Sequence, residues 1–461
     1  MGLLKSIKKR FEKHFLSKRY VESQFNELKW KINHVHSYNL TAASRMCSFQ
    51  EISTLTNKDE IHNIAFVSIL PPETSGIATH SLYSFIECDG ESIDIFTKPV
   101  NDESFFINRQ ILNKKSTANI YHLDSFLLAN EKRNYRNIII AVGNSNHHFY
   151  IWSFLEKLKQ GGLIDKVTIY VHDCFLHNIM YDGRGIDRPL NYAQEIGSLY
   201  QLDEGEIYDL MKSKDKWKLQ KDIIDLGILG LRVFQSMGVS QYLVNSKAAL
   251  KLVTKDIDFK LNPKVSRIFL PVLDNEALSR GKGSASLCKT EGFLYLGTFG
   301  VVSDAKCIQE LIESVCQLNS NGYKIKLVVA GWHANEYMRK VNERQRECLI
   351  VIDSPSDNDL LNLMKSVDWA VQLRRFNRGE SSGIVPMLLQ SGIPTIVSRL
   401  GSFSEFGSSV LFFDNDNLPR LADFIKTELT PLKSVELKEE MLDYVQRHNS
   451  SNYCKELKKI C

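Results

Sequence analysis

Two glycine-bearing turns in the second half of the chain carry residues that could bind an anion. The first, residues 297–306, reads GTFGVVSDAK and lies between an apolar run and a predicted helix at 308–318. Free N–H groups at the turn, the positive end of the helix dipole and the ammonium group of Lys306 together suit a diphosphate. We therefore predict that Gly300 and Lys306 contact such a group.

The second turn, residues 372–383, reads QLRRFNRGESSG and also stands between an apolar run and a predicted helix. Its three arginines and single glutamate are hard to explain by packing alone. Arg375 is predicted to face solvent, because adjacent residues of a regular element cannot both face one site. Arg374 or Arg378 is then left to supply a positive charge for the same anion, with Glu380 as the carboxylate beside them.

The first half carries a glycine turn and two histidine stretches, each directly after an apolar run. Residues 69–80 read ILPPETSGIATH, and Gly76 there would let the backbone approach a ligand. His147 and His148 follow one run, and His172 and Asp173 follow the next. A histidine in such a place can donate to a sugar hydroxyl. One of His147 and His148 is expected to be structural.

The histidines and the aspartates are not interpreted as metal ligands. His177 is expected to be a structural helix residue, and no spacing among the histidines resembles a known ligand set. The three Asp-x-Asp strings are interpreted as solvated turns: Asp256-Ile-Asp258, Asp357-Asn-Asp359 and Asp414-Asn-Asp416. We therefore predict no metal site and no cofactor.

Short runs rich in Ile and Val alternate with helical stretches, which indicates βαβ units and parallel sheets. The predicted strands are 64–69, 93–96, 138–142, 167–171 and 242–245, and then 293–296, 325–330, 349–352, 369–373, 395–397 and 410–413. This pattern predicts an α/β protein with two doubly wound, Rossmann-like domains. Ligands bind such sheets at the carboxyl ends of their strands, so the turns above would meet in a cleft between the domains.

The same pattern divides the chain into five parts. The predicted parts are a basic amphipathic helical segment at 1–60, a first Rossmann-like domain at 61–275 with a helical insertion at 180–237, a polar linker at 276–291, a second Rossmann-like domain at 292–430 and a helical tail at 431–461.

Residues 1–20 combine seven Lys or Arg with a single Glu and place apolar side chains at helical spacing. A helix of this kind suits an anionic membrane surface, although a surface helix packed on its own domain is an alternative. The rest of the 461 residues carries slightly more acid than base, so no nucleic-acid partner is expected. We therefore place the protein at the cytoplasmic face of a membrane, as a peripheral protein.

The nine cysteines are odd in number and scattered without any Cys-x-x-Cys spacing. This usage favours reduced thiols in a cytosolic compartment over a disulfide framework. No stretch of the sequence approaches 18 consecutive apolar residues, the length expected of a membrane-spanning helix.

Six segments occur in the order seen in family 4 glycosyltransferases, which have the GT-B fold and retain anomeric configuration. These segments are PPETSGIATHS, GNSNHHFYI, YVHDCFLHN, LGTFGVVSDAK, RGESSG and SGIPTIVSRLGSFSE. The chain resembles that family over about residues 62–430, including members that act in surface-polysaccharide assembly such as O-antigen or capsule. The resemblance implies a nucleotide-sugar donor, a glycan acceptor that is lipid-linked, and a tail that crosses back to brace the first domain.

The resemblance also assigns roles residue by residue. His172, Lys306 and Glu380 would be the catalytic residues, with His147, His148 and Asp173 on the acceptor side. The donor-binding residues would be Gly76, Thr298, Gly300, Lys306, Arg374, Arg378, Glu380, Ser381, Ser382, Gly383 and Glu405. Two positions depart from the family: Met387 stands where a second glutamate is usual, and Thr298 replaces an arginine.

We therefore predict a hexosyltransferase that uses a nucleotide-diphosphate sugar. Two alternatives remain open. A non-catalytic GT-B scaffold at a membrane surface would explain Met387 and Thr298, and a nucleotide-sugar epimerase would share the fold but leave the basic N-terminus without a purpose.

Overall fold

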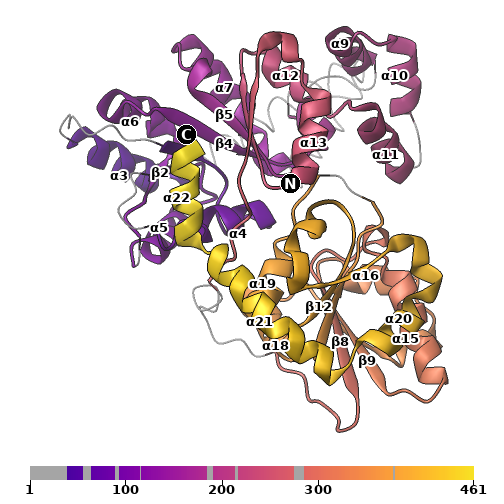
Figure 1. Cartoon of the computed structure of the whole chain (residues 1–461). Helices are drawn as coiled ribbons and strands as arrows, with labels where there is room; N and C mark the ends of the chain where they lie inside the picture. Colours follow the sequence, from indigo (N-terminus) through magenta and orange to yellow (C-terminus); the bar gives the residue numbers. More distant parts are fainter. Residues whose placement is uncertain are drawn as a thin grey trace, which may run out of the picture.

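The computed structural model describes residues 39–55, 64–88, 93–114, 116–183, 190–212, 216–274, 285–376 and 379–460. These residues form two α/β domains, which lie one above the other in Figure 1. Both sheets are parallel, so the predicted fold class is confirmed. The basic segment 1–20 and Arg378 lie outside the described residues.

The first domain contains a seven-stranded sheet of order β3-β2-β1-β4-β5-β6-β7. Its strands are β1 (Ile64–Val67), β2 (Ile93–Thr97), β3 (Asn119–His122), β4 (Asn137–Val142), β5 (Val167–Val171), β6 (Gln241–Val244) and β7 (Lys264–Arg267). Its helices outside the insertion are α3 (Ala42–Ser53), α4 (Gly76–Tyr83), α5 (Asp102–Leu112), α6 (Phe126–Arg133), α7 (Tyr150–Gln160) and α13 (Lys247–Asp256), with short turns η1 (Leu123–Ser125), η2 (Asn146–His148), η3 (Ile164–Lys166) and η4 (Phe259–Leu261).

Helices cover both faces of this sheet, because successive side chains of each strand point to opposite faces. On β4, Ile138 and Ile140 join the core that includes Leu155 of α7. Ile139 joins the core on the other face, together with Leu82 of α4. The continuous apolar sequence of the strand therefore reflects burial on two sides.

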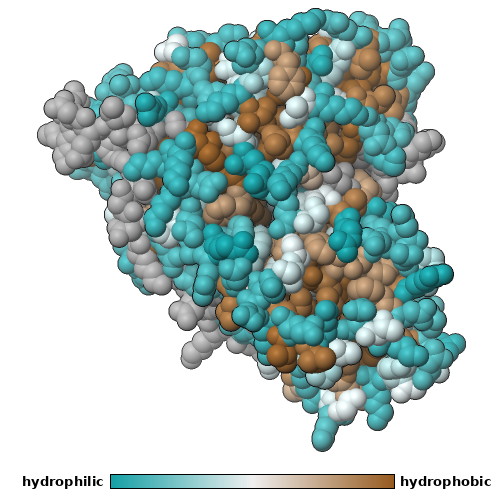
Figure 2. Space-filling model, in the orientation of Figure 1, coloured by the Kyte–Doolittle hydropathy of each residue, from teal (hydrophilic) through white to brown (hydrophobic). Residues whose placement is uncertain are grey.

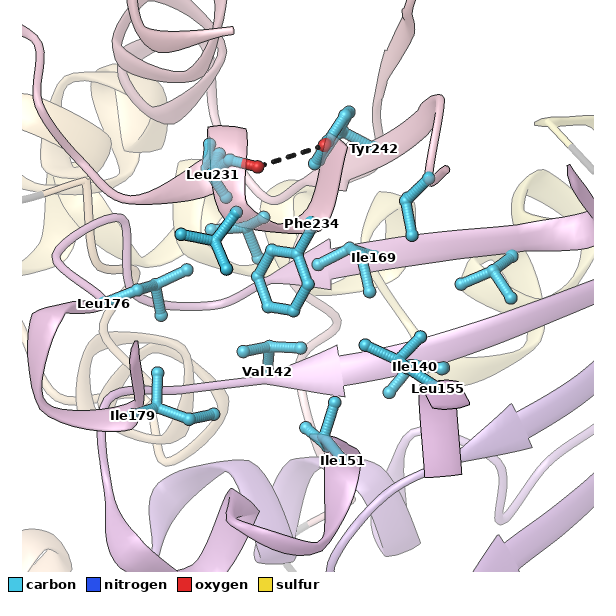
Figure 3. Close-up of a cluster of buried hydrophobic side chains, with 14 of the residues drawn as sticks. Ile140, Val142, Ile151, Leu155, Ile169, Leu176, Ile179, Leu231, Phe234 and Tyr242 are labelled. Atoms are coloured by element: carbon cyan, nitrogen blue, oxygen red, sulfur yellow. Dashed lines mark hydrogen bonds between the residues drawn. The ribbon is translucent and has the colours of Figure 1, made fainter. Parts of the chain in front are cut away.

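A helical layer is inserted between β5 and β6. It consists of α8 (His177–Tyr181), α9 (Leu190–Tyr200), α10 (Glu204–Met211), α11 (Lys216–Leu226) and α12 (Leu231–Ser236). Figure 3 shows Phe234 of α12 against Val142 and Ile169 of the sheet, with the Tyr242 hydroxyl donating to the Leu231 carbonyl at 3.4 Å. The layer thus shares the core of the first domain.

The second domain contains a six-stranded sheet of order β10-β9-β8-β11-β12-β13. Its strands are β8 (Leu294–Phe299), β9 (Ile325–Gly331), β10 (Leu349–Asp353), β11 (Trp369–Gln372), β12 (Thr395–Ser398) and β13 (Leu411–Phe413). Its helices are α15 (Ile308–Ser320), α16 (Ala334–Met338), α17 (Glu343–Arg346), α18 (Asp357–Lys365), α19 (Ile384–Gln390) and α20 (Leu421–Glu428), with short turns η5 (Asp304–Lys306), η6 (Gly401–Ser409) and η7 (Asn415–Arg420).

The C-terminal tail connects the two domains. Helix α21 (Pro431–Arg447) packs on α19 of the second domain, and α22 (Ser450–Ile460) continues from it to the first domain in Figure 1. The Ser450 hydroxyl donates to the Tyr83 carbonyl at 3.2 Å. The prediction that the tail braces the first domain is therefore confirmed.

A disulfide joins Cys88 to Cys454 of α22, 366 residues apart in the sequence. The prediction of reduced cysteines was wrong for this pair. Two cysteines can be bridged only when their Cα atoms come within about 7 Å, and spacing along the chain does not show that. The pair meets because the tail returns to the first domain.

Most of the visible surface in Figure 2 is hydrophilic, and one brown patch low on that face lies over α21 of Figure 1. Leu432 and Val435 of α21 are 70% and 63% exposed. Among the described residues, no helix is long and apolar enough to cross a membrane.

Candidate functional site

Lys306 lies at the turn after β8, inside the protein rather than on its surface. The whole residue is 7% exposed, and its Nζ donates to the Phe299 carbonyl at 2.8 Å. Gly300 has a positive φ of 90°, and a Cβ atom there would lie 2.9 Å from Lys306 Nζ. Glycine at position 300 therefore leaves the room that the ammonium group occupies.

The pKa of Lys306 is lowered well below its usual value. Burial is the main cause, the charge of Arg374 lowers the pKa further, and Glu380 opposes both effects. A buried ammonium group gains most from an anion that replaces its lost hydration. Lys306 is therefore placed to gain a strong interaction from a bound diphosphate.

Arg374 and Glu380 lie next to Lys306 in the loop between β11 and α19. Arg374 Nε is 3.7 Å from Glu380 Oε1, and their side chains are 20% and 15% exposed. The Ser402 hydroxyl of η6 donates to the Glu380 carbonyl at 2.9 Å, which fixes the loop. The structure thus brings together three of the residues that the sequence analysis predicted.

The segment Ser381–Gly383 leads from this loop into α19 and reaches the first domain. The Ser381 hydroxyl oxygen is buried without a hydrogen-bond partner among the described residues, and Ser382 is 6% exposed. A Cβ atom at Gly383 would lie 2.6 Å from Nε2 of His80. Gly383 therefore allows α4 of the first domain to approach closely.

His80, His148 and His172 form a histidine cluster on the first domain. They come from α4, η2 and the end of β5, and Asn245 Nδ2 lies 3.1 Å from His172 Nδ1. The other five ring nitrogens of the cluster are buried and have no hydrogen-bond partner in the part of the chain that the structure describes. The strands β1 and β4 that precede His80 and His148 are neighbours at the point where the strand order reverses, the usual place for a ligand in such sheets.

All three imidazoles of the histidine cluster are neutral near pH 7. Burial lowers the pKa of His80 to about 4 and that of His148 to about 4. Burial also lowers the pKa of His172 to about 3, with a further contribution from the other two rings. A neutral imidazole offers one N–H donor and one acceptor nitrogen, which matches the needs of a hydroxyl group.

Sequence reasoning assigned no role to His80, although it quoted the segment that contains it. His80 stands five residues after Ser75, the N-cap of α4, and so faces inward on the first turns of the helix. The available signal was that the helix of His80 follows β1, just as the two other histidines follow strands of the same sheet.

His147 lies apart from the cluster and pairs with Glu73. His147 Nδ1 is 2.6 Å from Glu73 Oε2, and the two side chains are 23% and 25% exposed. Asp173 accepts from the Phe175 backbone N–H at 3.0 Å, and Gly76 is the first residue of α4 with open space beside it. These predicted residues line the end of the first sheet, with Glu73 as an addition that the sequence did not indicate.

Two other expectations from the sequence need correction. Thr298 is 2% exposed within β8, which extends to Phe299, so it is a strand residue and not part of the turn. Asp256 is completely buried and accepts from the Leu229 and Leu231 backbone N–H groups, so it is not in a solvated turn.

Glu405 contacts the first domain. It accepts from the Lys247 backbone N–H and, at 3.1 Å, from Arg267 Nη1. Lys247 is the first residue of α13, so Glu405 places a carboxylate at that helix N-terminus from the opposite domain. His177 Nε2 donates to the Ile228 carbonyl and its Nδ1 accepts from the Tyr192 hydroxyl, as expected of a structural residue.

No group of three or more His, Cys, Asp or Glu among the described residues is arranged to hold a metal ion. Among the described residues, Lys306 and Arg374 form the cationic side of the site.

Comparisons with known proteins identify the fold. No protein-family model and no curated protein matches the sequence. A solved structure described as trehalose-6-phosphate from E. coli bound with UDP-2-fluoro glucose is similar over 87% of this chain and 99% of its own, at 10% identity and a TM-score of 0.51. The chain has the GT-B fold.

A second structure of this fold supports the assignment. An α,α-trehalose-phosphate synthase (UDP-forming) from Burkholderia xenovorans, in complex with glucose-6-phosphate, is similar over 86% of this chain and 99% of its own. Its identity is 10% and its TM-score is 0.50. At such low identity the similarity establishes the GT-B architecture alone, with two Rossmann-like domains around a cleft.

Proposed function

We propose that the protein is a glycosyltransferase that moves a hexose from a nucleotide-diphosphate sugar to a glycan. The observation that supports it most is the contrast across the cleft. Buried Lys306 lies with Arg374 on the second domain, and the neutral histidine cluster meets that domain at Gly383. A nucleotide sugar has the same division into an anionic diphosphate and an uncharged, hydroxyl-rich ring.

The proposed chemistry needs stabilisation of a leaving group. The bond between the anomeric carbon and the diphosphate oxygen breaks, and its electron pair leaves with the nucleoside diphosphate. The acceptor oxygen bonds to the same carbon, and its proton passes to the departing diphosphate. Lys306 and Arg374 stabilise the negative charge that develops on the diphosphate. Preorganised groups of this kind are usually the largest electrostatic contribution to catalysis.

Glu380 and His172 take the sugar side of the same reaction in this proposal. Glu380 accepts hydrogen bonds from ring hydroxyls beside Arg374, while His172 approaches the transferred sugar from the first domain. We further propose that anomeric configuration is retained, as the resemblance to family 4 implies, and that Lys306 and Arg374 replace a divalent metal.

We also propose that the acceptor is a lipid-linked surface glycan and that the protein works as a peripheral protein at the cytoplasmic face of a membrane. The support comes from residues 1–20, with seven basic residues and helical spacing of their apolar side chains. On α3, which is the first described helix after this segment, Met46 is 68% exposed and Phe49 is 37% exposed.

Binding to vesicles tests the membrane proposal separately. The full chain is expected to sediment with vesicles that contain anionic phospholipid and not with neutral ones, and a variant with Lys8, Lys9 and Arg10 changed to Gln is expected to stay in solution. Equal binding of this variant to anionic vesicles would overturn the membrane proposal and leave the transferase proposal standing.

Release of nucleoside diphosphate tests the transferase proposal. Purified protein is incubated with UDP-, GDP-, dTDP- and ADP-hexoses in EDTA, with and without extracted lipid-linked glycans. Release from one donor that increases with acceptor, and that is lost in Lys306→Ala, supports the proposal. Absence of release from every donor with every acceptor would contradict it, and would favour the non-catalytic scaffold.

A further inference from the structure

A cavity between the two domains is lined in part by Ser381, Ser382 and Glu405, which the family resemblance assigned to donor binding, but not by Lys306 or Arg374. This hinge cavity has a volume of about 380 Å³ and lies between the two domains beside α21. Its walls include Asn245, Lys247 and Arg267 from the first domain, Ser404 from the second, Tyr444 of α21 and His448, which caps the end of α21. Its volume falls within the range of about 300–1,000 Å³ that is typical of small-molecule sites.

Hydrogen bonds and an ion pair hold the walls of the hinge cavity in place. The Val272 backbone N–H donates to the His448 carbonyl at 2.7 Å, which ties the segment that leaves the first domain to the end of α21. Glu405 ties the other side to Arg267 and to the backbone of Lys247. The hinge cavity is therefore a feature of the conformation in which the two domains are in contact.

Aromatic rings form one wall of the hinge cavity. The rings of Tyr444 and His448 are stacked with centroids 4.0 Å apart, and Phe269 packs edge-on against His448 at 4.9 Å. Phe406 packs against Tyr444 at 5.3 Å. Amphipathic rings of this kind provide flat apolar contact area next to polar atoms, which suits the faces of a sugar ring.

Polar groups complete the lining. Four serines, among them Ser404 and Ser381, line the cavity together with Asn245. The Ser381 hydroxyl oxygen is buried and unpartnered among the described residues, so it has a hydrogen bond to offer. Several hydroxyl-binding groups around an aromatic wall indicate a ligand with several hydroxyls.

The charges of the hinge cavity favour a single negative charge on that ligand. Arg267 is paired with Glu405, whereas the ammonium group of Lys247 forms no ion pair within the described part of the chain. Burial lowers the pKa of His448, so this ring adds no positive charge near pH 7. The exposed Lys247 therefore provides one positive charge that has no ion-pair partner among the described residues.

We propose that the hinge cavity binds a monosaccharide unit that carries one carboxylate or phosphate group. The anionic group meets Lys247, the ring packs on Tyr444 and His448, and the hydroxyls bond to the serines. Because the walls come from both domains, the bound sugar holds the domains together. The inference goes beyond the proposed transfer reaction and does not require it.

Two hydrogen bonds connect the hinge cavity to the reaction cleft. Asn245 lines the cavity and bonds to His172, and Ser402 lines the cavity and bonds to the Glu380 carbonyl. Occupancy of the hinge cavity therefore restrains both residues. A ligand in this cavity is expected to tighten nucleotide-sugar binding in the cleft.

Binding of small sugars to the full chain, without any nucleotide, tests the proposal by isothermal titration calorimetry. Glucuronate and glucose 6-phosphate are the two anionic probes, and they separate a carboxylate from a phosphate ligand. Glucose and inorganic phosphate are the controls. At least one anionic sugar is expected to bind ten-fold or more tightly than both controls.

Four variants locate the binding. Lys247→Ala is expected to weaken the anionic sugar at least ten-fold, and Lys247→Gln repeats the test with most of the side chain kept, in case truncation perturbs folding. Lys340→Ala, an exposed lysine elsewhere on the second domain, and Lys306→Ala are expected to leave the affinity unchanged. Circular dichroism confirms that each variant is folded.

Two results would overturn the proposal. One is failure of both anionic sugars to bind more tightly than glucose and phosphate. The other is binding that survives both substitutions of Lys247, or that is lost in Lys306→Ala, since the ligand would then occupy the reaction cleft. Neither result depends on whether the protein transfers a sugar, so the transferase proposal is judged by its own assay.

Discussion

The two sides of the cleft bury different kinds of polar groups. The first domain buries three neutral imidazoles, whose pKa values fall to about 4 or about 3 because of burial. The second domain buries an amine, Lys306, next to the arginine and carboxylate of Arg374 and Glu380. Each side therefore matches a different part of a ligand: the imidazoles match hydroxyls, and the cations match phosphate.

Loss of the buried cation gives the largest expected effect. Lys306→Ala removes one preorganised group that faces the developing charge, which typically costs about 2.7–4 kcal/mol, or about 100-fold or more in kcat/KM. Steady-state rates of nucleoside diphosphate release measure it. The matched control is Lys340→Ala, whose side chain is 64% exposed and pairs with Asp304, and it is expected to keep the wild-type rate.

The neutral histidine cluster is expected to make the fold sensitive to acid. Histidines whose pKa values are lowered in the folded state stabilise the fold above the unfolded pKa of 6.5, and this contribution is lost as the pH falls towards about 4. With about 1.36 kcal/mol for each pKa unit, each ring loses about 3 kcal/mol of the free energy of unfolding over that range.

Urea unfolding at several pH values measures this loss. His80→Asn and His148→Asn are expected to flatten the decline between pH 6.5 and 4, because each variant removes one group that must be protonated. His333→Asn is the control, since that side chain is 66% exposed. An unchanged slope in both cluster variants would show that these rings are not buried as neutral groups.

Smaller effects are expected from single histidines on sugar binding. A neutral hydrogen bond contributes about 0.5–1.5 kcal/mol net, so His80→Ala or His148→Ala weakens the sugar-dependent part of donor binding by up to about 10-fold. Competition between the nucleotide sugar and the free nucleoside diphosphate measures this part. A uniform loss for both ligands would contradict the assignment of the cluster to hydroxyl groups.

The smallest expected effect concerns the contact between the domains. Arg267→Ala removes a pair between side chains that are 38% and 22% exposed, and such pairs contribute about 0–1 kcal/mol. The melting temperature is therefore expected to fall by only a few degrees, with donor affinity retained. A large loss of stability would mean that Arg267 supports more than its contact with Glu405.

The sequence predicted the parts of this site that depend on local pattern. The buried parallel strand β4 shows a continuous apolar run at 138–142, and Lys306 and Glu380 stand in glycine-bearing turns directly after strands. Strands β3 and β7 were not predicted. The residues of β7, which ends at Arg267, are exposed or half-exposed, so this strand has no apolar run that the sequence could show.

The parts that were missed depend on contacts between distant segments. The burial of Asp256 requires Tyr200, which donates to it at 2.7 Å from the inserted helical layer. The pairing of Cys88 with Cys454 requires the return of the tail, and the role of His80 requires its approach to Gly383. Spacing within one segment carries no information about such encounters.

Affinity measurements with a matched pair of ligands test the division of the cleft most directly. The free nucleoside diphosphate and its sugar form are titrated by calorimetry, in EDTA, into the wild-type protein, Lys306→Ala and His80→Ala. The account predicts that Lys306→Ala loses affinity for both ligands, and that His80→Ala loses only the extra affinity due to the sugar. Equal weakening of both ligands by His80→Ala, or unchanged diphosphate affinity in Lys306→Ala, would contradict it.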